Sequence, residues 1–313
     1  MEDFLITVII PVFQEESQIF ENIHTVHRLL AGNSIKHDFI LIEDGSRDNT
    51  WQVIKKLAGE LPEVRAYRLS RNFGKEAALC AGLEHFKSDA CVVMDADLQH
   101  PPEIIPKMVE LWKTGAFDVV EGVKASRGTE SLLNKLGAHT FYKLLKKFSG
   151  LELNRASDFK LLDAKVIDAW KQMGERITFF RGMSAWVGFR RTSIPFVVAD
   201  RKHGSSKWSF GGLLRLAVNA ITAFSSAPLH IVTFIGMLFL AGSVILGIQT
   251  LYMKFAGISF SGFTTVILLL LFIGSTLMIS LGIIGTYIAR IFDEVKFRPR
   301  YIISESTEKN KLE

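Results

Sequence analysis

The residues best suited to chemistry in this chain are the acids and the amide of Asp95-Ala96-Asp97-Leu98-Gln99, which follow the apolar run 91–94. Such a run is typical of a buried strand, so these side chains are expected at its C-terminal end. Open α/β sheets bind their ligands at that edge. Carboxylate and amide oxygens suit Mg²⁺ or Mn²⁺ beside a diphosphate, so we predict a divalent cation held by Asp95, Asp97 and Gln99. A solvated strand-to-helix loop is the alternative.

Alternating strand and helix patterns in residues 1–125 predict the elements that position this loop. Apolar, β-branched runs indicate strands, and helical spacing of apolar residues indicates the helices between them. The predicted strands are 5–12, 39–42, 64–69, 91–94 and 118–123, and the predicted helices are 16–30, one that begins near Asp48, and 74–86. This alternation predicts an α/β domain with a Rossmann-like, mostly parallel sheet.

The composition describes a chain that is rich in apolar residues and mildly basic. Of its 313 residues, 48% are hydrophobic, and 37 Lys and Arg against 32 Asp and Glu give a formal net charge of +5. That excess suits anionic ligands or an anionic membrane surface without selecting between them. We expect no nucleic-acid partner, and we expect Cys80 and Cys91, which lie in apolar stretches, to be buried free thiols.

Two apolar stretches near the C-terminal end, 229–253 and 263–288, contain no Asp, Glu, Lys or Arg. A bilayer core of ~30 Å requires about 20 helical residues, so we predict membrane spans of about 229–253 and 263–291. Basic residues before the first span and after the second place both ends in the cytoplasm by the positive-inside rule. The segment 209–227 carries apolar residues on one helical face, so we expect an amphipathic helix in the membrane interface.

Several short motifs occur in the order found in family 2 glycosyltransferases. They are Ile10-Pro11-Val12-Phe13-Gln14-Glu15, Glu43-Asp44-Gly45-Ser46, Arg71-Asn72-Phe73-Gly74-Lys75, Asp95-Ala96-Asp97-Leu98-Gln99, Ser157-Asp158-Phe159-Lys160, Trp186-Val187-Gly188-Phe189 and Gly204-Ser205-Ser206-Lys207-Trp208. The chain resembles that family over nearly its whole length, especially the branch of dolichyl-phosphate mannose synthases and bacterial polyprenyl-phosphate glucosyltransferases. The resemblance implies an A-type glycosyltransferase fold. It departs from the common pattern in having Phe13-Gln14 in place of Tyr-Asn and Glu43 in place of Asp.

The resemblance also implies roles for residues that bind the nucleotide sugar. Pro11, Glu15 and Asp44 match positions that line the base and ribose, and Asp95 belongs to the donor side as well as to the metal site. Lys75 has two interpretations, since it follows a glycine at a predicted helix start. It either approaches the diphosphate or is a solvated first-turn lysine.

Other residues are predicted to act on the reaction or the acceptor. Asp97, Asp158 and Arg127 form the predicted catalytic set. Asp158 matches an acceptor-side carboxylate, and a helix N-cap is its competing role. Arg127, Lys202 and Lys207 are the candidates to bind an acceptor phosphate, although for Lys202 simple attraction to anionic lipid is an equal alternative.

The sequence therefore predicts four parts, a catalytic glycosyltransferase domain at 1–208, an interfacial helix at 209–227, a transmembrane hairpin at 228–291 and a cytoplasmic tail at 292–313. The predicted enzyme transfers a single sugar, with glucose from UDP-glucose favoured, to membrane polyprenyl (undecaprenyl) phosphate. The resemblance implies inversion, and the topology places the reaction at the cytoplasmic face of the inner membrane.

Alternatives to this reaction remain open at this stage. The donor of the same reaction could be GDP-mannose or a UDP-aminoarabinose derivative. A non-catalytic, membrane-anchored subunit that binds nucleotide sugars would carry the same binding motifs. A homo-oligomer is compatible with every one of these interpretations.

Overall fold

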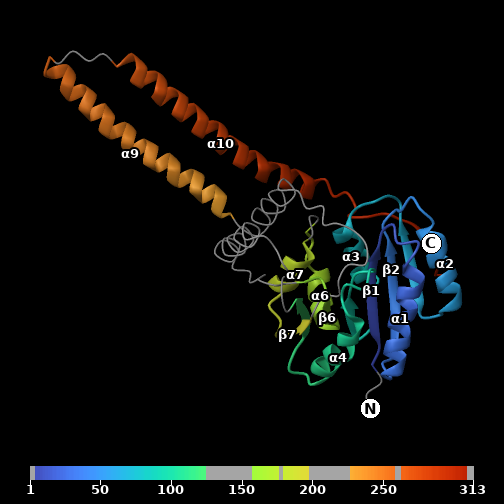
Figure 1. The fold of residues 1–313 in the computed structure, drawn as a ribbon. Helices are drawn as coiled ribbons and strands as arrows, with labels where there is room; N and C mark the ends of the chain where they lie inside the picture. Colours follow the sequence, from blue (N-terminus) through green and yellow to red (C-terminus); the bar gives the residue numbers. More distant parts are fainter. Residues whose placement is uncertain (1–3, 125–156, 176–178, 197–225, 258–261, 309–313) are drawn as a thin grey trace. The chain divides into compact units, whose positions relative to one another are not determined.

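The computed structural model describes residues 4–124, 157–175, 179–196, 226–257 and 262–308 (Figure 1). The chain divides into two compact units, one formed by Met1–Ser209 with Arg298–Glu313 and the other by Phe210–Phe297. The predicted acceptor-phosphate residues Arg127, Lys202 and Lys207 lie outside the described residues. So does nearly all of the predicted interfacial helix.

The first unit is built on an eight-stranded sheet with the order β7-β5-β6-β4-β1-β2-β3-β8. Its central strands are parallel, and they are β4 (Ala90–Val93), β1 (Ile6–Val12), β2 (His37–Glu43) and β3 (Val64–Leu69). On one side, β6 (Lys160–Asp163) pairs antiparallel with β4 and β5 (Val119–Lys124), and β7 (Arg191–Phe196) is parallel to β5. The predicted Rossmann-like sheet is therefore present and continues into a mixed region.

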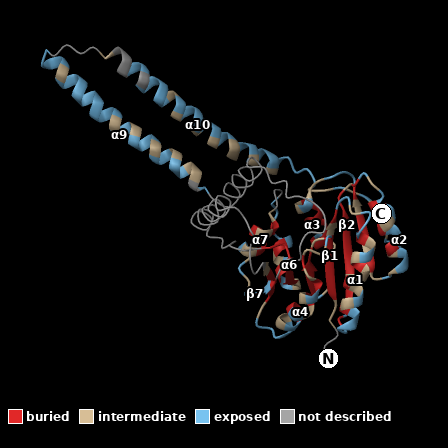
Figure 2. Ribbon diagram, viewed as in Figure 1, coloured by how far each residue is buried: buried red, intermediate tan, exposed pale blue. Residues whose placement is uncertain are grey.

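Helices cover both faces of the parallel strands, which explains why β1 and β4 are buried on both sides. Val8 and Ile10 belong to one core with apolar residues of α1 (Ile19–Gly32), α2 (Thr50–Glu60) and α4 (Ile105–Lys113). On the opposite face Ile9 contacts α3 (Lys75–Glu84), where Gly82 lies so close to Ile9 that a Cβ would collide with it. Figure 2 shows this buried centre in red.

Three shorter helices complete the described part of the first unit. The 3₁₀ turn η1 (Pro102–Ile104) precedes α4, and α6 (Ala164–Lys171) follows β6. Asp163 is the N-cap of α6, because its carboxylate accepts the Lys165 backbone N–H at 3.0 Å. The last helix, α7 (Phe180–Trp186), stands before β7.

The C-terminal residues belong to the first unit, which the sequence analysis did not anticipate. Ile303–Ser306 forms the edge strand β8 antiparallel to β3, with Arg68 opposite Glu305. Backbone bonds extend the pairing, from Ser70 N–H to Ile302 O at 2.8 Å and from Thr307 N–H to Ala66 O at 2.9 Å. The predicted tail 292–313 therefore begins within α10 and contributes the short strand β8 to the sheet, where it covers the open edge of β3.

The second unit contains two long apolar helices, α9 (Ala227–Phe255) and α10 (Phe263–Val295). Within them, Pro228–Phe255 and Leu269–Val295 are long and apolar enough to cross a membrane, and the most apolar window of each has no buried residue. Phe239 and Phe272 meet between the helices with ring centroids 5.3 Å apart. Exposed apolar surface of this extent is typical of a membrane or interaction surface, and both helices coincide with the spans predicted from the sequence.

Candidate active site

A pocket of about 290 Å³ opens where the parallel strands β1, β2 and β4 end. We call it the strand-edge pocket; its lining residues are Pro11, Val12, Phe13, Glu15, Asp44, Asn72, Gly74, Lys75, Asp95, Ala96 and Asp97. Parallel strands present their C-terminal ends at one edge, and this is why segments distant in sequence meet here. The structure thus brings together all the residues predicted to bind a nucleotide sugar, and Asp97 with them.

Asp44 shapes one wall of the pocket by holding the loop before α3. Its two carboxylate oxygens accept the backbone N–H groups of Phe73 at 2.7 Å and Gly74 at 2.9 Å. Burial raises the pKa of the Asp44 carboxyl, and these two donors offset part of that rise. Gly45, with φ of +64°, passes so close to the Arg71 backbone that a side chain there would collide with it.

Asp95 and Asp97 occupy different environments in the same loop. Asp95 is partly buried, and its Oδ1 lies 2.5 Å from Nζ of Lys75. Asp97 is exposed, and its Oδ1 accepts the Gln99 backbone N–H at 3.1 Å. Gln99 itself is not among the pocket residues. Within the described ranges no three His, Cys, Asp or Glu side chains gather as a metal site.

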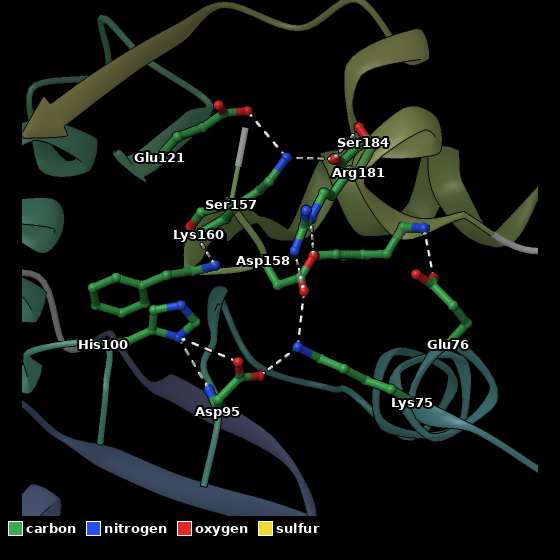
Figure 3. Close-up of polar contacts among 12 residues, drawn as sticks. Lys75, Glu76, Asp95, His100, Glu121, Ser157, Asp158, Lys160, Arg181 and Ser184 are labelled. Atoms are coloured by element: carbon green, nitrogen blue, oxygen red, sulfur yellow. Dashed lines mark hydrogen bonds and ion pairs between the residues drawn. The ribbon is translucent and has the colours of Figure 1, made fainter. Parts of the chain in front are cut away.

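Asp158 is buried two residues before β6 and is held by two cations, as Figure 3 shows. Arg181 donates from Nε to Oδ1 at 2.7 Å and from Nη2 to Oδ2 at 2.9 Å, and Lys75 donates to Oδ2 at 2.8 Å. Burial raises the pKa of the Asp158 carboxyl, but Arg181 and Lys75 outweigh it and hold the pKa well below its usual range. We call Asp158, Arg181 and Lys75 the Asp158 cluster.

These contacts bear on the two alternative roles that the sequence left open, a helix N-cap for Asp158 and a solvated first-turn lysine for Lys75. Asp158 caps no described helix, since the N-cap of α6 is Asp163. Lys75 is not an isolated, solvated lysine, because it joins Asp95 on the pocket side to Asp158. Burial lowers the pKa of Lys75, whereas the two carboxylates raise it by more. Lys75 is therefore a cation under the working conditions of most enzymes.

A second buried network supports the helix that carries Arg181. The Lys160 side chain is fully buried and donates to Oε1 of Glu121 at 3.1 Å and to Oγ of Ser184 at 2.7 Å (Figure 3). Ser184 and Arg181 both lie on α7, so Lys160 and Glu121 connect that helix to β6 and β5. Burial lowers the pKa of Lys160, and Glu121 offsets part of the effect.

Two further residues complete the surroundings of the Asp158 cluster. Glu76 accepts the Phe180 backbone N–H at 2.7 Å, and burial raises its pKa to about 7. His100 stacks on Phe159 with ring centroids 5.1 Å apart, and its Nδ1 accepts the Asp95 backbone N–H at 3.3 Å. Burial lowers the pKa of His100, in agreement with an acceptor nitrogen at this position.

Sequence reasoning assigned no role to Lys160, Glu121, Glu76 or His100, and it interpreted Phe179-Phe180-Arg181 only as packing around the acceptor side. A signal existed for Lys160, because it is the single charge inside the apolar run 159–162. A lysine in such a strand is rarely buried without a partner. The partners themselves come from elements distant in sequence, and no local pattern identifies them.

The chain belongs to Glycosyl transferase family 2, which it matches over residues 7–170. It is 37% identical over 306 residues to the SfII prophage-derived bactoprenol glucosyl transferase of Shigella flexneri, covering 96% of this chain and 98% of that protein. It is also 37% identical over 300 residues to the prophage bactoprenol glucosyl transferase homolog of Escherichia coli K12, covering 95% and 98%. The predicted family and the A-type glycosyltransferase fold are confirmed.

A solved structure also aligns with this chain. It is mannosyl-3-phosphoglycerate synthase from Rubrobacter xylanophilus, with a TM-score of 0.48 at 14% identity. The alignment covers 71% of this chain and 73% of that one.

Proposed function

We propose that this glycosyltransferase moves one sugar, glucose from UDP-glucose, onto a membrane polyprenyl phosphate with inversion at the anomeric carbon. The observation that carries the proposal is the position of Lys75, which joins the strand-edge pocket to the ionised, buried Asp158. A donor in the pocket would present its sugar toward that cluster. Full-length similarity to proteins named bactoprenol glucosyl transferase supports the choice of acceptor and of glucose.

The charge of the pocket supports a divalent cation in the reaction. Its lining includes four carboxylates, those of Glu15, Asp44, Asp95 and Asp97, against the single cation Lys75. A diphosphate would be repelled by this lining unless a cation lay between them. Mg²⁺ suits such a place, because it is commonly held by one or two carboxylates together with substrate phosphates and waters.

Asp97 and Asp95 are the residues that would hold this ion, since Asp97 is exposed and has only one described bond. Gln99 remains a predicted ligand, although its side chain does not line the pocket. When bound, the ion would stabilise the charge that develops on the departing diphosphate. Mg²⁺ and Mn²⁺ both suit these oxygen donors.

The residues of the Asp158 cluster would orient the reactants and take up no proton. A phosphate monoester has a second pKa of about 6, so the acceptor arrives largely as a dianion at neutral pH. One of its oxygens would bond to the anomeric carbon while the bond from that carbon to the diphosphate breaks. Asp158 has a lowered pKa and two cationic partners, which makes it a poor base and leaves its charge balanced beside the acceptor.

The membrane helices would keep the acceptor near this site. We propose that α9 and α10 cross the inner membrane with the catalytic domain in the cytoplasm, as the positive-inside rule predicts. A cysteine at the exposed Ala256 should react with an impermeant thiol reagent from outside the cell, and one at the exposed Glu308 should not. The native Cys80 and Cys91 are buried and give little background. The reverse labelling pattern would contradict the topology.

The direct test uses the purified full-length protein with undecaprenyl phosphate and Mg²⁺. Radiolabelled UDP-glucose, GDP-mannose and a UDP-aminoarabinose derivative are compared, and only UDP-glucose should yield labelled lipid. Transfer from another donor would correct the sugar and keep the reaction. Donor binding by calorimetry without any transfer would instead identify a non-catalytic nucleotide-sugar-binding subunit. The Asp97→Ala variant is the control for background.

A further inference from the structure

The C-terminal strand β8 is connected to the strand-edge pocket by a continuous series of polar contacts. Glu305 on β8 accepts a hydrogen bond from Nη1 of Arg68 on β3 at 2.8 Å. Arg68 also donates from Nε to Oε2 of Glu43 at 3.0 Å. The other oxygen of Glu43 accepts the Ser46 backbone N–H. Oγ of Ser46 in turn accepts the Gln14 backbone N–H at 2.9 Å.

The last residue of this series has an unusual backbone conformation. Gln14 has a φ of +56°, which side chains other than glycine adopt only when their surroundings hold them there. Its neighbours Phe13 and Glu15 both line the strand-edge pocket. Only two described side-chain bonds hold this turn, the Ser46 bond to Gln14 and a bond from Glu15 N–H to Oγ1 of Thr50 at 3.0 Å. The shape of this pocket wall therefore depends on the placement of Ser46.

Burial explains why the series acts as a unit. The Glu43 side chain is 0% exposed, the Arg68 side chain 28% and the Glu305 side chain 44%. A fully buried carboxylate requires a charged partner, and Arg68 is that partner for Glu43. Glu305 accepts from a second nitrogen of the same guanidinium and so fixes its plane.

Glu305 makes a second contact that rigidifies its own position. It accepts the indole N–H of the buried Trp51 at 2.8 Å. Trp51 stands in the first turn of α2, directly after Thr50, whose hydroxyl holds Glu15. Glu305 is thus linked to the Ser46 bond through Arg68 and Glu43, and through Trp51 to the neighbouring Thr50, whose hydroxyl also donates to Oδ1 of Asp48 at 2.6 Å.

We infer that β8 is a positioning element for the donor pocket and that Glu305 is its positioning residue. The segment that follows the second membrane helix in the sequence thereby sets the wall formed by Phe13 and Glu15. The inference rests on the proposed function only in taking the pocket as the nucleotide-sugar site. The departure from the family pattern at Glu43 agrees with it, because the longer side chain reaches both Arg68 and the Ser46 amide.

The test compares Glu305→Ala, Glu305→Gln and Glu308→Ala in the full-length protein. Glu308 is a matched control, because it has the same 44% side-chain exposure and also pairs with an arginine of β3. That arginine is Arg65, whose other acidic partner is Asp38 and not a residue of the pocket. Glu305→Gln retains an oxygen acceptor and should show a smaller effect than Glu305→Ala.

The first measurement is amide hydrogen exchange in the absence of ligand. Glu305→Ala should accelerate exchange in peptides that cover Gln14 and Ser46, and Glu308→Ala should leave those peptides unchanged. Peptides that cover Asp97 serve as an internal reference. This measurement does not depend on the identity of the donor, so it remains decisive if UDP-glucose fails to bind the wild-type protein and the proposed donor is wrong.

The second measurement is donor affinity by calorimetry and steady-state kinetics with UDP-glucose. In Glu305→Ala we expect Kd and donor KM to rise about fivefold with kcat unchanged, because the residue touches no reacting group. Unchanged exchange at Gln14 would overturn the inference, and so would equal effects from Glu305→Ala and Glu308→Ala. If Glu305→Ala fails to fold, Glu305→Gln takes its place. Unchanged exchange at Gln14, or effects equal to those of Glu308→Ala, would then overturn the inference.

Discussion

Asp97 in the strand-edge pocket is exposed to solvent, whereas Asp158 in its cluster is surrounded by protein groups. Asp97 is exposed and accepts one backbone N–H. Asp158 is buried and accepts three hydrogen bonds from Arg181 and Lys75. An exposed carboxylate can exchange its waters for a cation at little cost, while a buried one must be neutralised by the fold itself. Asp97 is therefore suited to bind a ligand reversibly, and Asp158 is suited to carry a permanent charge.

Lys75 connects these two regions, because it contacts an acid in each of them. It contacts Asp95 in the loop of Asp97 and also contacts Asp158. A change in the charge of either region is thus felt by the other through one ammonium group. The variants below separate a ligand-binding acid from a preorganised one, beginning with the largest expected effect.

Replacing Asp97 with alanine should remove nearly all turnover and leave the fold intact. An exposed acid contributes little to packing, but loss of a group that supports charge at the leaving diphosphate costs on the order of 10³-fold in kcat. The measurement is lipid-linked product formation beside an apparent Tm, which should stay at the wild-type value. Full activity in this variant, or in wild-type protein with excess EDTA, would show that the pocket works without a metal ligand at Asp97.

Replacing Lys160 with methionine should destabilise the region beneath the Asp158 cluster. The change removes the 3.1 Å partner of the buried Glu121 and leaves it only the more distant Arg191 at 3.9 Å, and breaking a buried pair in this way costs about 3 kcal/mol. The double variant Lys160→Met with Glu121→Gln should recover part of that loss, because no buried charge is left unpaired. Apparent Tm values of the single and double variants check this. Equal stability of the single variant and wild type would show that Lys160 does not support α7.

Replacing Asp158 with asparagine should slow turnover by about 10²-fold and leave its pH inflection in place. Wild-type turnover should rise through the acceptor's own pKa of about 6 and then become flat, because the acceptor must be a dianion. Asp158 already has a lowered pKa, so its protonation cannot produce that inflection. If the inflection disappears in Asp158→Asn while the acceptor titrates normally, Asp158 is a general base.

The elements that carry the pocket could be predicted from sequence, because each is marked by a local pattern. Pro11 lies near the C-terminal end of β1, and Asp44 and Asp95 follow β2 and β4, so parallel strands must bring these residues together. The partners of Asp158 could not be predicted in this way. Arg181 is 23 residues away in sequence from Asp158, and no periodicity links the two positions.

The edge strand β8 was missed for a related reason. Only the first of its four residues, Ile303, is apolar, and a strand of this length gives no reliable periodic signal. Its assignment depends on β3, which is 237 residues earlier at the Arg68 contact with Glu305. Pairing across such a separation is a tertiary property, so a polar C-terminal segment looked like a free tail.

The pKa values of the neighbouring acids Glu76 and Asp158 shift in opposite directions, so Glu76 gives the sharpest contrast with Asp158. The effect expected from its replacement is the smallest of the four. Burial raises the pKa of Glu76 from 4.5 to about 7, whereas the cations around Asp158 lower the pKa of that carboxyl overall. Between pH 4.5 and 7 the folded protein therefore binds more protons at Glu76 than the unfolded chain does, and stability falls as pH rises. The contribution of Asp158 is fully present above its unfolded pKa and stays constant over this range.

Replacing Glu76 with glutamine should remove that fall, because glutamine imitates the protonated acid and can still accept the Phe180 N–H. The variant should exceed wild type only slightly at pH 5, where the unfolded carboxyl has begun to ionise, and by ~2 kcal/mol at pH 8, discounted for partial exposure. His37 and His100, whose pKa values burial lowers, give the opposite slope in both proteins and cancel in the difference. The measurement is the difference in apparent Tm between variant and wild type at the two pH values. A difference that does not grow with pH would mean that Glu76 is ionised throughout, and the contrast with Asp158 would fail.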